Sequence, residues 1–139
     1  MTDQAFARAV ESGSVTPAEF GHLAHVRVAW VYLHETASVE DALSTMRAAI
    51  QRFASAAGVP QKYHETITVF WMRLLANVRA LGAAGELAEV LREFPALADK
   101  DLPLRYYSRE RLFSDEARTG WVDPDRRPHG VIAFQDTEA

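Results

Sequence analysis

Three consecutive stretches of the sequence, residues 16–36, 38–58 and 63–81, repeat apolar side chains at helical spacing, and short links join them. Apolar residues that recur every three or four positions fall on one face of an α-helix. Short links make consecutive helices antiparallel neighbours. Because no convincing alternation of a β-strand appears before residue 131, the pattern predicts an all-α fold built on a bundle of three long helices.

Local signals mark where these helices start and stop. Thr16, followed by Pro17 and then Glu19, is typical of an N-cap with a capping box. Glu19 fits this capping role better than the role of a metal ligand. Ser38 is a natural N-cap for the second helix, and Gly58 ends it. The first two helices are therefore predicted from their ends as well as from their faces.

Shorter helical segments are predicted to pack around the three long ones. They are residues 3–11, residues 86–94, and two short pieces capped by Ser108 and Ser114 that end at residues 119–120. From about residue 121 to residue 139 the chain is rich in Pro, Asp and Arg, which predicts an extended or irregular tail; its residues 131–134 are apolar and are expected to pack as a strip. A length of 139 residues suits one helical domain covering residues 1–139.

The composition narrows the classes of function. The chain has no cysteine, so disulfides and thiolate metal sites are excluded, and a cytoplasmic location is expected. A net charge of −4 without a basic run argues against binding to nucleic acid or to acidic membranes. No signal-peptide profile and no apolar run of about 18 residues is visible. A small-molecule substrate is the expected partner.

Histidines on the inward faces of two helices are the main functional signal. His22 and His25 lie early in the first long helix, and His64 lies at the start of the third. If consecutive helices are antiparallel, the first and the third are parallel to each other. All three imidazoles are then expected at the same end of the bundle, where an unpaired buried polar group would cost about 1–3 kcal/mol.

Three neutral imidazoles that converge on one point form a metal site with a position left open. Nitrogen ligands suit a divalent transition metal, either Zn, Cu, Fe or Ni. We therefore predict a small mononuclear metal-dependent enzyme that acts on a small organic substrate. Its metal ligands are His22, His25 and His64, and its candidates for proton transfer are Glu65 and Tyr107.

Two other interpretations of the histidines remain open. In one, the protein is a non-catalytic helical module that binds a small molecule or a protein, and the histidines line its pocket. In the other, one histidine oriented by Glu65 performs acid–base catalysis without a metal. Positive side chains near Tyr107 offer a way to hold a substrate carboxylate; they are Arg105, Arg109 and Arg111. His34 and His129 have no apolar context and are assigned no role.

Overall fold

A computed structural model describes residues 1–127 of the chain, and these residues form seven α-helices, four 3₁₀ turns and no β-strand. The α-helices are α1 (Asp3–Glu11), α2 (His22–Glu35), α3 (Val39–Ala56), α4 (Glu65–Ala80), α5 (Leu87–Glu93), α6 (Arg109–Leu112) and α7 (Asp115–Thr119). The 3₁₀ turns are η1 (Pro17–Glu19), η2 (Pro60–Lys62), η3 (Pro95–Ala98) and η4 (Leu102–Arg105). The prediction of an all-α fold is confirmed.

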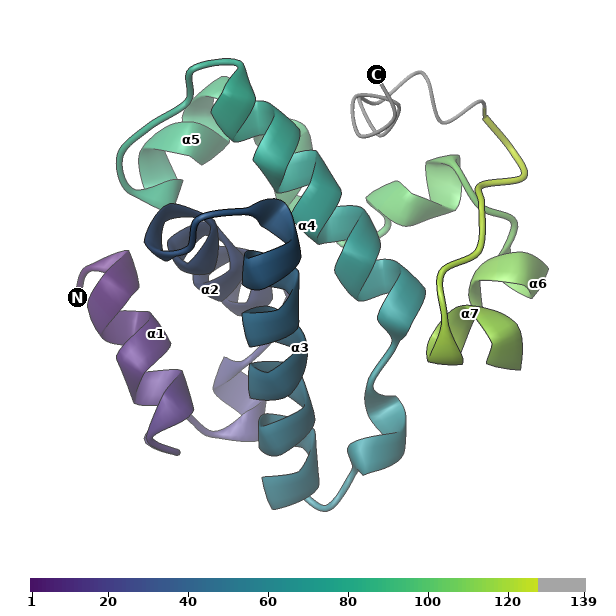
Figure 1. Cartoon of the computed structure of the whole chain (residues 1–139), viewed down its shortest axis with the longest axis horizontal. Helices are drawn as coiled ribbons and strands as arrows, with labels where there is room; N and C mark the ends of the chain where they lie inside the picture. Colours follow the sequence, from purple (N-terminus) through teal and green to yellow (C-terminus); the bar gives the residue numbers. More distant parts are fainter. Residues whose placement is uncertain (128–139) are drawn as a thin grey trace.

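The three longest helices, α2, α3 and α4, all contact one another. In Figure 1, α3 stands nearly upright, α4 runs diagonally across the view, and α2 is foreshortened. The bundle of three long helices, with the first and third parallel, stays a prediction. Helix α1 packs on α2 and α3, whereas α7 packs on α4.

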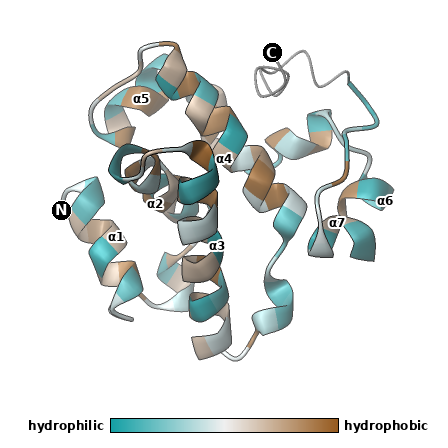
Figure 2. Cartoon of the chain, viewed as in Figure 1, coloured by the Kyte–Doolittle hydropathy of each residue, from teal (hydrophilic) through white to brown (hydrophobic). Residues whose placement is uncertain are grey.

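The core is built from the buried faces of these helices. Large side chains fill it, and those almost completely hidden from solvent include Trp30, Tyr32, Phe70, Leu75 and Tyr107. Figure 2 shows hydrophilic and hydrophobic residues mixed along the helices, as expected for helices that each bury one face and leave the other in water. No helix within residues 1–127 is both long enough and apolar enough to cross a membrane.

Helix α4 begins at Glu65 rather than at residue 63, and α2 begins well after residue 16. The capping box of Thr16 and Glu19 forms, but it starts only the short turn η1. The backbone leaves the helical region at Phe20, which buries its ring against Phe53 with a centroid distance of 4.4 Å. Helix α2 then starts afresh at His22 with Gly21 as its N-cap. A helix running from residue 16 without a break is therefore a wrong prediction.

The shorter elements agree well with their sequence signals. Helix α1 has the predicted bounds, and Ser108 and Ser114 cap α6 and α7 through their side-chain oxygens. Residues 121–127 have no regular secondary structure, as predicted for the start of the tail. His129 and the apolar strip at residues 131–134 lie outside the described residues.

Candidate binding site

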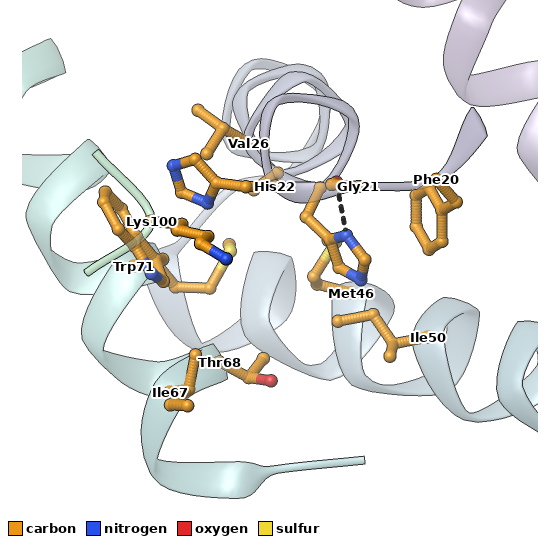
Figure 3. A pocket seen from close by; sticks show the side chains of 13 residues that line it. Phe20, Gly21, His22, Val26, Met46, Ile50, Ile67, Thr68, Trp71 and Lys100 are labelled. Carbon is orange, nitrogen blue, oxygen red and sulfur yellow. Dashed lines mark hydrogen bonds between the residues drawn. The ribbon is translucent and has the colours of Figure 1, made fainter. Parts of the chain in front are cut away.

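A cavity of about 300 Å³ lies between the N-terminal half of α2 and the facing sides of α3 and α4 (Figure 3). Most of its walls are apolar, and they come from three different helices. The lining residues are Phe20, Gly21, His22, His25, Val26, Ala29, Met46, Ile50, Ile67, Thr68, Trp71, Met72 and Lys100. Two of the three histidines singled out in the sequence, His22 and His25, therefore reach the same cavity.

His25 is held in one orientation and in one neutral tautomer. Its Nδ1–H donates a hydrogen bond to the carbonyl oxygen of Gly21 at 2.8 Å, the bond drawn dashed in Figure 3. Its ring stacks on Phe20 with the centroids 3.9 Å apart. Because a carbonyl oxygen can only accept, the proton of the neutral ring is on Nδ1 and the lone pair is on Nε2. Burial lowers the pKa of His25, which favours this neutral form.

His22 joins the cavity to a distant part of the chain. Its Nε2–H donates to the carbonyl oxygen of Leu97 in η3 at 2.9 Å, so the neutral ring has its lone pair on Nδ1. The same ring lies against Trp71, with a centroid distance of 4.6 Å. His22 thereby fixes η3 against α2, and η3 leads directly to Lys100, a further lining residue.

Lys100 and Thr68 complete the polar side of the cavity. In Figure 3 the Lys100 ammonium group points toward the middle of the lining residues. The Thr68 hydroxyl donates to the carbonyl oxygen of His64 at 2.8 Å and keeps its oxygen as an acceptor. Sequence reasoning missed both residues. Thr68 follows His64 by one helical turn and could have been found from that spacing, whereas Lys100 sits between two 3₁₀ turns and has no periodic signal.

His64 does not line this cavity. It is the N-cap of α4, where its Nδ1 accepts a hydrogen bond from the backbone N–H of Ile67 at 3.1 Å. Its Nε2–H donates to the carbonyl oxygen of Leu112 at 2.6 Å. Both ring nitrogens are thus engaged in bonds that hold α4 and α6 in place. Burial lowers the pKa of His64, because the charged ring would lose its solvation.

The structure therefore does not assemble the three histidines predicted to hold a metal. Within residues 1–127, no group of three or more His, Asp or Glu side chains is arranged to hold a metal ion. A centre of His22, His25 and His64 would require one ring nitrogen of His64 to give up its hydrogen bond with Ile67 or with Leu112. The tri-histidine centre, and with it the divalent metal, stays a prediction.

The two residues predicted to transfer protons do not line the cavity. Glu65 accepts two hydrogen bonds from the Arg47 guanidinium, at 2.9 and 2.6 Å, and one from the Tyr63 hydroxyl. The Arg47 bonds lower the pKa of Glu65, and burial together with Glu65 raises the pKa of Tyr63 to about 12. Tyr107 is buried and donates its hydroxyl proton to the carbonyl oxygen of Val122 at 2.6 Å. Glu65 therefore links α4 to α3, and Tyr107 links the segment before α6 to the segment after α7.

The arginines proposed to hold a carboxylate also lie outside the cavity lining. Arg105 pairs with Asp99 at 3.5 Å, and the Nε–H of Arg111 donates to the carbonyl oxygen of Asp123 at 2.6 Å. The Nδ1–H of His34 donates to the carbonyl oxygen of Trp30 on the same helix at 2.8 Å, and the two rings lie edge to face with their centroids 4.6 Å apart. Among residues 1–127, Lys100 is the one lysine or arginine that lines the cavity.

Comparisons with protein-family models, with curated proteins and with solved structures find no match to this chain. The cavity is therefore the feature of the protein that bears most directly on its function.

Proposed function

We propose that the protein is a helical module that binds a small, largely apolar molecule in the cavity between α2, α3 and α4. The observation that supports this most is the combination of apolar walls with a few converging polar groups. Ligand sites in proteins have this composition, and a volume of about 300 Å³ is at the lower end of their range.

The apolar walls indicate a ligand-binding cavity rather than a packing defect. Met46, Ile50, Ile67 and Trp71 line the space from two helices. Burying such surface is worth about 25 cal/mol for each Å² removed from water. A ligand that covers these walls recovers free energy that the protein alone does not obtain.

The polar groups give the site its selectivity. His22 and His25 each keep one ring nitrogen free of backbone bonds, and a backbone carbonyl fixes which nitrogen it is. A neutral imidazole held in this way accepts a hydrogen bond from a ligand hydroxyl or N–H group. The ligand is therefore an apolar molecule with a polar end.

Calorimetric titration with 1-octanol tests the proposal, because this molecule has a flexible apolar chain and one hydroxyl group. Ala29 is buried in the cavity wall, so Ala29→Leu places a larger side chain in the ligand's space. Ala48 is half-buried on α3 and does not line the cavity, so Ala48→Leu makes the same chemical change elsewhere.

We expect saturable binding to the unmodified protein and to Ala48→Leu, with affinity at least about tenfold weaker in Ala29→Leu, since the added side chain competes for the same volume. Equal affinity in the two variants would show that the alcohol binds elsewhere. Absence of binding to the unmodified protein at the solubility limit of the alcohol would contradict the proposal.

A further inference from the structure

The cavity has one cationic side chain whose charge the described protein leaves unmatched. Lys100 lines the cavity, and it forms no ion pair with any of residues 1–127. Its neighbour Asp99 is directed to Arg105. Among the described residues no Asp or Glu lines the cavity. A ligand therefore meets a single positive charge at an otherwise apolar site.

From this we infer that the pocket takes a monocarboxylate with an apolar tail, whose carboxylate pairs with the Lys100 ammonium while the tail lies against Met46, Ile50 and Trp71. The inference rests on the proposed function and names the class of ligand. Charge complementarity is the reason: one ammonium group matches one anionic group, and a tail that leads inward covers the apolar walls.

The placement of Lys100 favours an ion pair at the polar end of the cavity rather than in its interior. Lys100 is exposed overall although it lines the cavity, and its ammonium group points inward in Figure 3. The η3 turn before it is held to α2 by the bond from His22 to Leu97. A carboxylate at this position stays partly in water, so it avoids the cost of burying a charge completely.

The sequence provides a matched control, because it contains only two lysines, Lys62 and Lys100. Lys62 is exposed at the end of η2 and does not line the cavity. Lys100→Met and Lys62→Met remove the same charge and keep an unbranched side chain. Both sites are exposed, so neither change is expected to disturb folding.

Calorimetric titrations of the two variants with octanoate and with 1-octanol separate the inference from the proposed function. Lys100→Met should bind octanoate about fivefold more weakly than the unmodified protein, the upper end for partly exposed ion pairs. The ratio of octanoate affinity to 1-octanol affinity should therefore fall about fivefold in Lys100→Met, and Lys62→Met should bind both ligands as the unmodified protein does.

An unchanged octanoate affinity in Lys100→Met overturns the inference, and so does an equal loss of octanoate affinity in Lys62→Met. If 1-octanol still binds in either case, the proposed function stands. Binding of 1-octanol without any binding of octanoate has the same meaning. If neither ligand binds the unmodified protein, the proposed function fails and the inference fails with it.

Discussion

Replacement of His64 should reveal a structural role through a large loss of stability. The ring accepts the N–H of Ile67 as the N-cap of α4 and donates to the carbonyl of Leu112 in α6. Loss of an N-cap costs about 0.5–2 kcal/mol. A buried carbonyl left without its donor costs about 1–3 kcal/mol. His64→Ala loses both bonds, and we expect it to lower the free energy of unfolding by about 2–4 kcal/mol.

The comparison with His64→Asn separates the two contributions. Asparagine is a good N-cap residue, so this variant keeps an acceptor for the N–H of Ile67 and loses only the longer reach to Leu112. Urea unfolding followed by circular dichroism should place it between the unmodified protein and His64→Ala. A loss below about 1 kcal/mol in His64→Ala, or equal losses in both variants, would refute the capping role.

Two further predictions concern buried or paired ionisable side chains. Burial lowers the pKa of both His25 and His64 below the ordinary value of 6.5, so the unfolded chain takes up protons first as the pH falls. Their contribution to stability is complete above pH 6.5 and is lost below it, which urea midpoints between pH 7.5 and pH 5 should show; a midpoint that rises on acidification would contradict the assignment. Glu65→Gln weakens the contact with Arg47, and we expect it to cost about 1–2 kcal/mol of stability without changing 1-octanol affinity; a large change in that affinity would restore Glu65 as a site residue.

Helical periodicity and capping residues were enough to predict the fold class and most helix ends. Ser38, Ser108 and Ser114 all cap helices as expected, because their hydroxyl oxygens satisfy backbone N–H groups locally. Such bonds span three residues, so the sequence alone contains the information. The early break at Phe20 was not predictable in this way, since it depends on burial of the ring against Phe53 from another helix.

The candidate site was predicted only in part. The spacing of His22 and His25 correctly placed both on one inward face, and both reach the cavity. His64 was expected beside them because the third helix was predicted to begin at residue 63 and to run parallel to the first, which would place His64 in its first turn; in the structure α4 begins at Glu65. Histidine is not among the favoured N-cap residues. The local sequence pattern therefore did not indicate that His64 would be the N-cap of α4. Lys100 reaches the cavity through tertiary packing of η3 on α2, which no local pattern encodes.

The most direct test of the proposed pocket uses the three methionines of the chain. Met46 and Met72 line the cavity, whereas Met1 is 79% exposed at the N-terminus and serves as an internal control. With methyl-¹³C methionine, a titration with 1-octanol should shift the Met46 and Met72 signals together along one saturable curve and leave the Met1 signal in place. Stationary Met46 and Met72 signals at saturating alcohol, or a Met1 shift of the same size, would contradict binding in this cavity.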